Sequence, residues 1–406
     1  MIIFYFKKEI SRIILICLSI NFLLGIEYVN AAESKKEPVL YAKACSVMDG
    51  NNGRVLYEKE GDKELSNAST TKIITCILVL ENCNIEEYVT VSNEAAKQPN
   101  VKLGIKKGEK YKIKDLLYAM MLESYNDCAY ALAEFVSGDI DKFSELMNEK
   151  LSQIGCEHTY FITPNGLDAQ ISGKSHHSSA NDLCRIMKYC VWDSAKSEEF
   201  QKITQTKNYS FIAENNRNVT VTNHNRLLLE NENIISGKTG FTAKAGYCYV
   251  GAYEKDGIKY CFSLLACGWP NNKNYKWVDS RKIMEYIQDF FEIYKSDFRF
   301  DKSITAKDYY TGSPSLSKWN NNNKVSYKII SENKNCLVKK DTKITYKINQ
   351  SEFTNDVYKR NETIGKIEYY CMKKLIFSQK ISLKNDLYKW KLEDLLFAVF
   401  KEYVSL

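Results

Sequence analysis

The fold is predicted from one stretch of the chain, Asn67-Ala68-Ser69-Thr70-Thr71-Lys72, and from the apolar run that follows it, Ile73-Ile74-Thr75-Cys76-Ile77-Leu78-Val79-Leu80. An apolar run of this length after hydroxyl side chains predicts a buried helix that begins at Ser69. Ser69 and Lys72 are three residues apart, so their side chains share one face of that helix. The helix start also places Ser69 at the positive end of the backbone dipole.

Strand patterns lie on both sides of this helix in the sequence. They predict one hairpin over residues 38–60, with strands at 39–42 and 55–57, and a second hairpin with strands at 246–253 and 259–267. Apolar side chains recur at helical spacing in three segments between the hairpins and in a closing segment: 113–121, 129–135, 143–154 and 278–294. We therefore predict an α+β domain, in which strands from both ends form one antiparallel sheet flanked by helices, with a helical subdomain beside it.

Two further motifs follow the first, Ser124-Tyr125-Asn126 and Lys238-Thr239-Gly240. Ser124 lies where one helical pattern stops and before the next begins, so its side chain can face a cleft. The Lys238-Thr239-Gly240 motif predicts a strand along which an extended ligand could lie. Gly240 permits close approach of the ligand, and Thr239 offers a hydroxyl to a terminal carboxylate. The cleft is expected between the sheet and the helical subdomain.

Together, the three motifs supply the groups needed for acyl transfer through a serine. Ser69 is the candidate nucleophile, and Lys72 can accept its proton if burial and a second cation, Lys238, lower its pKa. Ser124 can relay a proton to a leaving amine, and Asn126 can hydrogen-bond a substrate amide. Each motif is weak alone, because Ser-x-x-Lys recurs at Ser315 and Ser331, and Ser-x-Asn recurs at Ser179. In this order, however, the three form the motif group of penicillin-binding proteins and class A β-lactamases.

The bulk composition is that of a globular protein. The 406 residues suffice for two domains, with 44% hydrophobic and 26% charged residues. The formal charge of +7 favours an anionic envelope or lipid surface over nucleic acid as a partner. Four histidines and the absence of a Cys-x-x-Cys pair argue against a metal site, and no cofactor is expected. Of the 13 cysteines, those in apolar runs, such as Cys76 and Cys128, are expected to be small core residues.

The two ends of the chain carry targeting signals. Lys7, Lys8 and Arg12 border an apolar stretch, and small residues follow it, which predicts a signal peptide over residues 1–31 in preference to an uncleaved anchor. We predict a catalytic domain over 36–296, a small β-rich domain over 300–384 with strands at 324–330 and 343–348, and an amphipathic helix over 385–406.

The predicted final helix has one apolar side, broken only by Lys389 at its margin. The apolar side consists of Tyr388, Leu392, Leu395, Leu396, Val399 and Tyr403. The segment is too polar to span a bilayer but suited to lie on its surface. The alternative is that it packs on its own β domain. With the signal peptide, this predicts an exported protein at the outer face of the cytoplasmic membrane or in the cell wall.

The chain resembles the D-alanyl-D-alanine carboxypeptidases, the low-molecular-mass penicillin-binding proteins, over residues from about 38 to 295. The matching segments, in addition to the three motifs, are Thr163-Pro164-Asn165-Gly166-Leu167-Asp168, His177-Ser178-Ser179-Ala180-Asn181-Asp182-Leu183, Asn225-Arg226-Leu227-Leu228 and Ala245-Gly246-Tyr247-Cys248. The resemblance implies a β-lactamase/transpeptidase-like catalytic fold followed by a small β domain and an amphipathic tail. One departure is Tyr125, where many relatives carry a smaller residue.

The resemblance also implies roles for individual residues. Ser69 would form the acyl-enzyme, Lys72 would accept the proton, and Ser124 would relay it. Asn126, Lys238, Thr239, Gly240 and Phe241 would bind substrate, with Lys238 at the carboxylate end and the backbone amides of Ser69 and Phe241 forming an oxyanion hole. Lys276 aligns loosely with a basic residue near the carboxylate. The implied substrates are peptidoglycan stem peptides ending in D-Ala-D-Ala, and β-lactams would acylate the same serine.

Three other functions remain open from the sequence. A class A-like β-lactamase would need a second base for deacylation, but the segment 161–167 carries no acidic residue before Asp168. A DD-endopeptidase would cleave cross-links with the same groups. A non-catalytic envelope-binding module would use the basic β domain instead.

Overall fold

The computed structural model describes residues 37–213, 216–294, 303–320, 324–330, 335–371 and 373–404. The predicted signal peptide lies outside these residues, and so does the Ser-x-x-Lys fragment that begins at Ser331.

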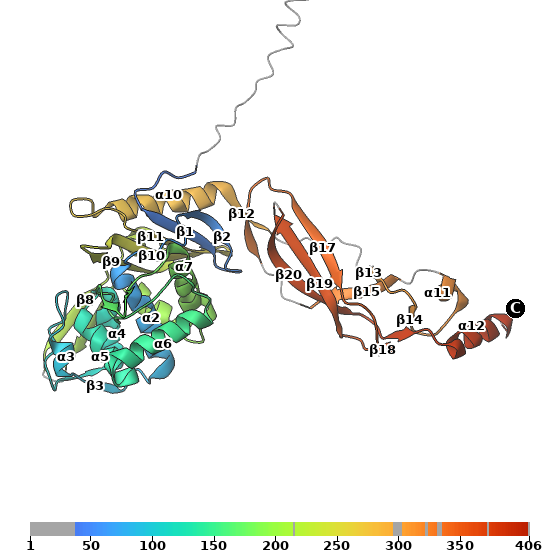
Figure 1. Ribbon diagram of the computed structural model, residues 1–406, viewed down its shortest axis with the longest axis horizontal. Helices are drawn as coiled ribbons and strands as arrows, with labels where there is room; N and C mark the ends of the chain where they lie inside the picture. Colours follow the sequence, from blue (N-terminus) through green and yellow to red (C-terminus); the bar gives the residue numbers. More distant parts are fainter. Residues whose placement is uncertain are drawn as a thin grey trace, which may run out of the picture. The chain divides into compact units, whose positions relative to one another are not determined.

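A five-stranded antiparallel sheet forms the centre of the first domain (Figure 1). Its strands follow the order β2 (Val55–Lys59), β1 (Ala44–Asp49), β11 (Ile258–Leu265), β10 (Gly246–Lys255) and β9 (Ile234–Thr242). Because β1 pairs directly with β11, strands from the two ends of the domain are neighbours. The predicted antiparallel sheet, shared by both ends, is confirmed.

The first predicted strand was misplaced, because β1 begins at Ala44 rather than at Val39. The side chain of Val39 is 83% exposed, and Tyr41 stacks on the ring of Tyr275 with the centroids 3.8 Å apart. Residues Ala44–Asp49 are all buried, and they pair on both sides, with β2 and with β11. Pairing along both edges of the strand therefore determines that β1 covers Ala44–Asp49, and the hairpin pattern did not predict this pairing.

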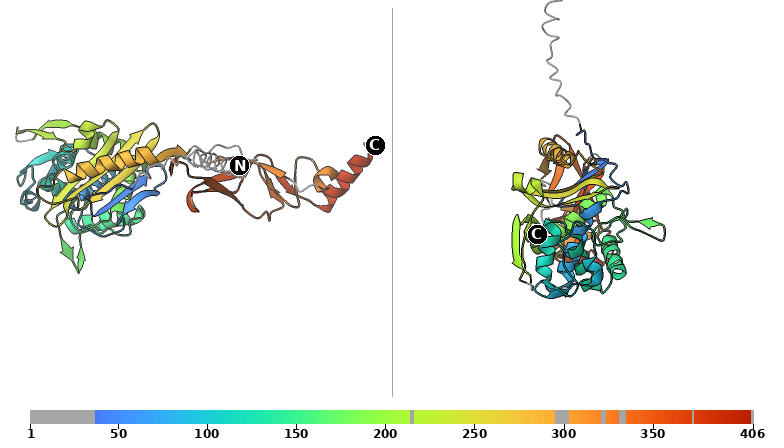
Figure 2. Two further views of the ribbon diagram at one scale, coloured as in Figure 1. Left: turned by 90° about the horizontal axis from the view of Figure 1, so that it is seen from above. Right: turned by 90° about the vertical axis from the view of Figure 1, so that its left-hand side faces the viewer.

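Helices cover both faces of this sheet (Figures 1 and 2). On one face, α10 (Tyr275–Phe290) packs Trp277, Ile283 and Ile287 against Tyr249 and Phe262 of the sheet. The other face carries the larger core, to which α7 (Ala180–Lys188) and α2 (Lys72–Asn82) contribute. The predicted closing helix over 278–294 is displaced toward the N-terminus: α10 begins at Tyr275 and ends at Phe290, because Phe291–Tyr294 form strand β12.

Helix α2 is buried on all sides, from Lys72 to Leu80, as its apolar run predicted. The α-helix begins at Lys72, however, and the preceding residues form a 3-10 turn, η1 (Ala68–Thr71). The predicted start of the helix at Ser69 is therefore three residues too early, and Ser69 lies in the 3-10 turn. Ala68 has a positive φ of 50°, a backbone conformation that is strained for a residue with a side chain.

The helical subdomain contains α4 (Ile113–Leu122), α5 (Asn126–Ser137), α6 (Ile140–Gln153) and α8 (Ser197–Gln205). Ser124 lies between α4 and α5, as predicted. Cys76 and Cys128 are fully buried core residues, and the twelve cysteines of the described part of the chain are all free thiols. The remaining elements of this domain are β3 (Tyr88–Thr90), α3 (Asn93–Ala96), β4 (Lys110–Lys112), β5 (Gln170–Ile171), β6 (Lys174–Ser175), η2 (Tyr189–Asp193), β7 (Asn208–Ile212), β8 (Asn218–Thr222) and α9 (Arg226–Glu230).

The C-terminal region forms a separate, sheet-rich domain, as predicted. Its largest sheet has the order β13 (Ser303–Thr305), β15 (Lys324–Ile329), β20 (Lys374–Leu383), β19 (Thr363–Cys371) and β17 (Ile344–Gln350). A core that includes Tyr327, Tyr369 and Ile381 holds these strands together. The other sheets pair β12 with β16 (Cys336–Lys339), and β21 (Leu387–Lys389) with β14 (Tyr309–Thr311) and β18 (Val357–Tyr358). A short helix, α11 (Leu316–Asn320), lies between β14 and β15 in the sequence.

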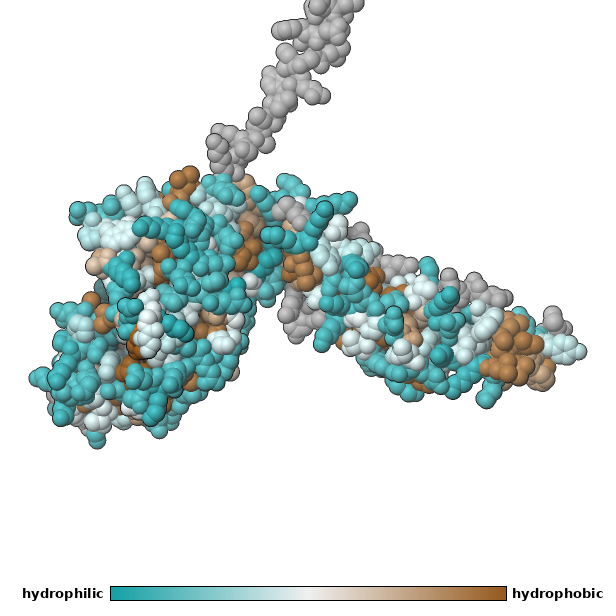
Figure 3. All heavy atoms as spheres, in the orientation of Figure 1, coloured by the Kyte–Doolittle hydropathy of each residue, from teal (hydrophilic) through white to brown (hydrophobic). Residues whose placement is uncertain are grey.

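The final helix, α12 (Leu392–Val404), begins at Leu392 and not at residue 385 as predicted. Leu387–Lys389 form β21 instead, where Lys389 lies opposite Tyr309, which explains why Lys389 broke the helical pattern. The helix exposes seven large apolar side chains, seen as a hydrophobic patch in Figure 3: Leu392, Leu396, Phe397, Val399, Phe400, Tyr403 and Val404. Over the residues that the structure describes, every helix is too short or too polar to cross a bilayer.

Candidate active site

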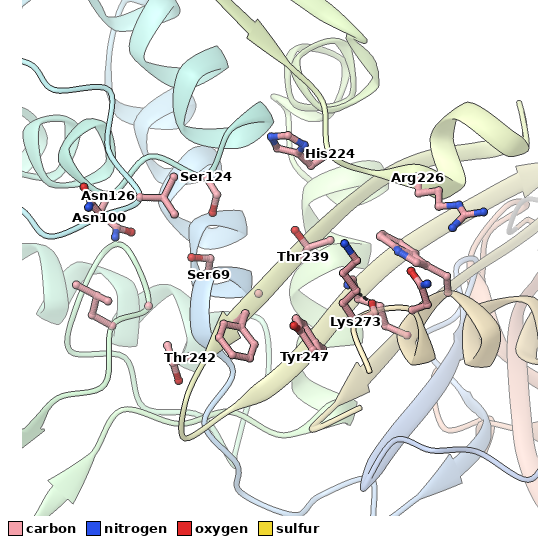
Figure 4. Close-up of a pocket in the computed structure, with 18 residues that line it drawn as sticks. Ser69, Asn100, Ser124, Asn126, His224, Arg226, Thr239, Thr242, Tyr247 and Lys273 are labelled. Atoms are coloured by element: carbon pink, nitrogen blue, oxygen red, sulfur yellow. Dashed lines mark hydrogen bonds between the residues drawn. The ribbon is translucent and has the colours of Figure 1, made fainter. Parts of the chain in front are cut away.

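The 3-10 turn that carries Ser69 lies against the edge strand β9 of the central sheet (Figure 4). A Cβ atom on Gly240 would lie 2.8 Å from the backbone oxygen of Asn67 and 3.1 Å from the backbone nitrogen of Ser69. Only glycine allows the strand and the turn to approach so closely. The spacing between the nucleophile turn and β9 therefore depends on Gly240.

The amine of Lys72 is surrounded by three oxygen atoms. Its Nζ lies 2.8 Å from Ser69 Oγ, 2.9 Å from Asn126 Oδ1 and 2.7 Å from the backbone oxygen of Asn165. Burial lowers the pKa of Lys72 well below its usual value, and the nearby charge of Lys238 lowers it further. A neutral amine has two N–H groups and one lone pair. If Asn126 and Asn165 accept the two N–H groups, the lone pair faces the hydroxyl of Ser69, from which it can take a proton.

Ser124 contacts strand β9 through the side chain of Lys238. Lys238 donates hydrogen bonds from Nζ to Ser124 Oγ, at 2.9 Å, and to the backbone oxygen of Thr239, at 3.1 Å. Burial lowers the pKa of Lys238 to about 7. Ser124 has a φ of 65°, so the connection between α4 and α5 is held in a strained conformation that presents this hydroxyl.

These groups border a cavity of about 630 Å³. Among the described residues that line it, four are basic and none is acidic. The four are His224, Arg226, Lys273 and Lys276. Burial lowers the pKa of Lys276 to about 8, and its Nζ lies 4.7 Å from the ring centroids of both Tyr247 and Trp277. Such a lining favours an anionic ligand.

The structure brings together all eight residues that the sequence singled out. Six of them line the cavity: Ser69, Ser124, Asn126, Thr239, Gly240 and Phe241. Lys72 and Lys238 lie behind this surface, with their amines in contact with Ser69 and Ser124. The competing fragments lie elsewhere in the fold: Ser179 caps α7 by accepting from the backbone N–H of Asp182, and Lys318 donates to the backbone of Thr311 and Ser313 rather than to Ser315.

One component of the site was missed, the backbone oxygen of Asn165. It belongs to the turn Pro164-Asn165-Gly166, in which Gly166 has a φ of 82°, and a Cβ atom on Gly166 would lie 2.0 Å from the backbone oxygen of Ala68. Turn residues at these positions were visible in the sequence. A main-chain acceptor, however, can be placed only when the fold is known.

Comparison with known proteins places the chain in a family. The family described as D-alanyl-D-alanine carboxypeptidase matches residues 31–265, which is more than half of the chain. The chain belongs to this family. The resemblance to the D-alanyl-D-alanine carboxypeptidases that was inferred from the motifs is therefore confirmed.

Individual relatives agree with this assignment. D-alanyl-D-alanine carboxypeptidase DacF of Bacillus subtilis is 29% identical over 239 residues, which cover 57% of this chain and 59% of the relative. DacC of Escherichia coli is 30% identical over 274 residues, which cover 64% of this chain and 65% of the relative. The match thus spans somewhat less than two thirds of the length of each of these two relatives.

A solved structure extends the likeness of fold beyond the catalytic domain. Penicillin binding protein 5 from Haemophilus influenzae superposes with a TM-score of 0.68, covering 87% of this chain and 99% of that chain at 24% identity. The predicted fold class, with a catalytic domain followed by a sheet-rich domain and a C-terminal helix, is therefore confirmed.

Proposed function

We propose that this member of the family removes the terminal D-alanine from peptidoglycan stem peptides that end in D-Ala-D-Ala. The observation that carries the proposal is the position of the buried Lys72 amine, 2.8 Å from Ser69 Oγ, at the wall of a cavity with a basic lining. This geometry supplies an activated nucleophile together with a site for a peptide that ends in a carboxylate.

In the proposed acylation, Ser69 Oγ attacks the carbonyl carbon between the two D-alanines while its proton passes to Lys72. The backbone amides of Ser69 and Phe241 stabilise the oxyanion. The bond from this carbon to the leaving nitrogen then breaks, and the proton held by Lys72 passes through Ser124, whose hydroxyl contacts Lys238, to that nitrogen, which leaves Lys72 neutral again. Water next attacks the acyl carbon and gives one proton to Lys72. When the bond from the acyl carbon to Ser69 Oγ breaks, Lys72 returns this proton to Ser69, and the shortened peptide leaves as a carboxylic acid. The net reaction consumes one water and releases one D-alanine.

The carboxylate of the substrate would be bound on the β9 side of the cavity. Lys238 provides a buried cation, Thr239 a hydroxyl, and Lys276 a second cation on the same side. Asn126 would hydrogen-bond the substrate amide, and Gly240 would let the peptide lie close to the strand. β-Lactams carry a carboxylate and a reactive amide, so they would acylate Ser69 as well.

A rapid β-lactamase is less well supported by this site. Deacylation in class A enzymes uses a glutamate to activate water. Among the described residues that line the cavity none is acidic, so no carboxylate there could take that role. We therefore expect a penicilloyl-enzyme that persists.

The test is release of D-alanine from a synthetic pentapeptide by the purified protein, measured beside Ser69→Ala. Ser315→Ala, in the unrelated fragment, is the matched control. We expect release by the wild type and by the control, and none by Ser69→Ala. Absence of release by a folded wild type, or rapid turnover of penicillin in its place, would refute the proposal.

We also propose that the enzyme is exported and that α12 lies on the outer face of the cytoplasmic membrane. Seven exposed apolar side chains on a helix of 13 residues support this placement, because such a face gains free energy at a lipid surface. Leu396→Asp and Phe400→Asp should together abolish cosedimentation with lipid vesicles. Glu402→Gln on the same helix is the control, and vesicle binding by the double variant would refute the role of the helix.

A further inference from the structure

His176 is a buried residue next to the turn Ala68–Thr71, and its ring forms hydrogen bonds with two segments of the active site. Its Nδ1 accepts hydrogen bonds from the backbone N–H groups of Ile162 and Thr163, at 3.0 and 3.3 Å. Its Nε2 lies 2.9 Å from the hydroxyl of Thr71, the residue before Lys72. The ring also stacks on Phe161, with centroids 4.9 Å apart. It therefore bridges the loop that leads to Asn165 and the turn that carries Ser69.

The partners of the ring fix the direction of each hydrogen bond. Because Nδ1 accepts from backbone N–H groups, the proton of the neutral ring is on Nε2, which donates to Thr71 Oγ1. The Thr71 hydroxyl in turn donates to the backbone oxygen of Ala68 at 3.0 Å, and it also accepts from Asn67 Nδ2 at 2.9 Å. The chain of donors thus runs from the loop through His176 and Thr71 to the carbonyl of Ala68.

The carbonyl of Ala68 determines where the amide of Ser69 points. Both groups belong to one planar trans peptide, in which C=O and N–H face opposite directions. Ala68 has a strained positive φ, so its peptide needs outside contacts to hold its orientation. Thr71 supplies a hydrogen bond to that carbonyl, and Gly166 packs against it.

We propose that His176 is a positioning residue for acyl transfer: through Thr71 it holds the Ala68–Ser69 peptide so that the Ser69 amide faces the oxyanion. This inference rests on the proposed function of the site. His176 does not touch the substrate cavity and takes no part in proton transfer. Burial, chiefly, lowers the pKa of His176 to about 3, so the ring stays neutral and the donor direction does not reverse at working pH.

Two substitutions at His176 distinguish the effect of losing its hydrogen bonds from the effect of changing the volume of the side chain. His176→Leu keeps an apolar side chain but removes both hydrogen bonds, whereas His176→Gln retains one acceptor and one donor. Removing an oxyanion donor outright costs about 100- to 1,000-fold in kcat, so loosening one should cost about 10- to 100-fold. We expect this loss of kcat in His176→Leu with KM nearly unchanged, because the oxyanion forms only in the transition state. His176→Gln should recover most of kcat. The neighbouring His177→Leu is the matched control and should retain full activity.

Thr71→Val tests the same connection without touching the histidine. It should lower kcat about as much as His176→Leu, and the double variant should lose no more than the larger single loss, because the two side chains act in series. Thermal unfolding of every variant shows which of them are folded. If His176→Leu does not fold, Thr71→Val and His176→Gln decide.

Full kcat in folded His176→Leu or Thr71→Val would overturn the inference. So would an equal loss of kcat in His176→Gln, or a loss carried by KM alone. These outcomes are distinct from failure of the proposed function, in which the wild type itself would release no D-alanine.

Discussion

Replacement of Asn126 by aspartate should disable the proposed base without changing the shape of the site. Asn126 Oδ1 lies 2.9 Å from the amine of Lys72, and both side chains are buried. In Asn126→Asp, a carboxylate oxygen takes the place of the amide oxygen. It stabilises the ammonium form of Lys72, raises the pKa of the amine, and leaves less of the neutral form that can accept the proton of Ser69.

The size of the effect follows from the distance. Two unit charges 2.9 Å apart attract each other by about 6 kcal/mol at an effective dielectric constant of about 20. About 1.4 kcal/mol corresponds to a tenfold change in the neutral fraction. The cost of burying the new carboxylate cancels part of this attraction. We therefore expect acylation to slow by about 100- to 1,000-fold at pH 7.

The assay is the rate of acylation by a fluorescent penicillin over a range of pH. Asn126→Ala is the matched control, because it also removes the amide but adds no charge. The aspartate variant should be slower than the alanine variant at pH 7 and should regain activity as the pH rises and Lys72 loses its proton. Equal rates for the two variants, with the same pH dependence, would refute the assignment of neutral Lys72 as the base.

Three further predictions concern other parts of the structure. Because burial lowers the pKa of Lys276 to about 8, the ammonium fraction falls about fivefold between pH 8 and 9, and KM for a peptide with a free carboxylate should rise by up to about fivefold over this range. Lys276→Arg should remove this part of the rise, and identical KM profiles for the two proteins would contradict the prediction. Gly166→Ala should abolish acylation and lower the free energy of unfolding by roughly 2 kcal/mol more than Gly173→Ala. Gly173 is the control because it has a similar φ of 80° but open space around it. Equal losses for the two variants in a denaturant titration would show that the contact with Ala68 is unimportant. In the unfolded protein His176 gains a proton below its usual pKa of 6.5, whereas in the folded protein the ring gains a proton only near pH 3. The free energy of unfolding should therefore fall by up to about 1.4 kcal/mol per pH unit as the pH drops from 6.5 to 3. His176→Gln should lack this contribution.

Much of the catalytic domain could be predicted because its chemistry is carried by side chains in short motifs. The apolar run after Lys72 predicted the buried helix α2, and the strand patterns near both ends of the domain predicted one shared antiparallel sheet, although the first strand was misplaced. Ser69 lies in the 3-10 turn that leads directly into α2, and residues three apart in such a turn share one face, so its contact with Lys72 follows from local spacing alone. The approach of Ser124 and Lys238 does not, because these residues are 114 positions apart and the fold must bring them together. The contact between Ser124 and Lys238 could be expected only because the three motifs occur in the same order as in the family.

The features that the sequence did not reveal are main-chain or tertiary in origin. The backbone oxygen of Asn165 contacts Lys72, but any residue type at position 165 would provide that oxygen. The two ends of the chain segment 387–404 look alike in periodicity, and only pairing with β14 and β18 draws Leu387–Lys389 into a strand. β1 was placed too early for the same reason, since its position depends on burial between β2 and β11. Tertiary pairing overrides local pattern in both segments.

Peptide mapping of the protein after brief exposure to benzylpenicillin tests the central claim most directly, because the claim is that one serine becomes acylated. We predict a single penicilloyl group on the peptide that contains Ser69, and its loss in Lys72→Ala. An adduct on another serine, or an unmodified Ser69 in folded protein, would contradict the account.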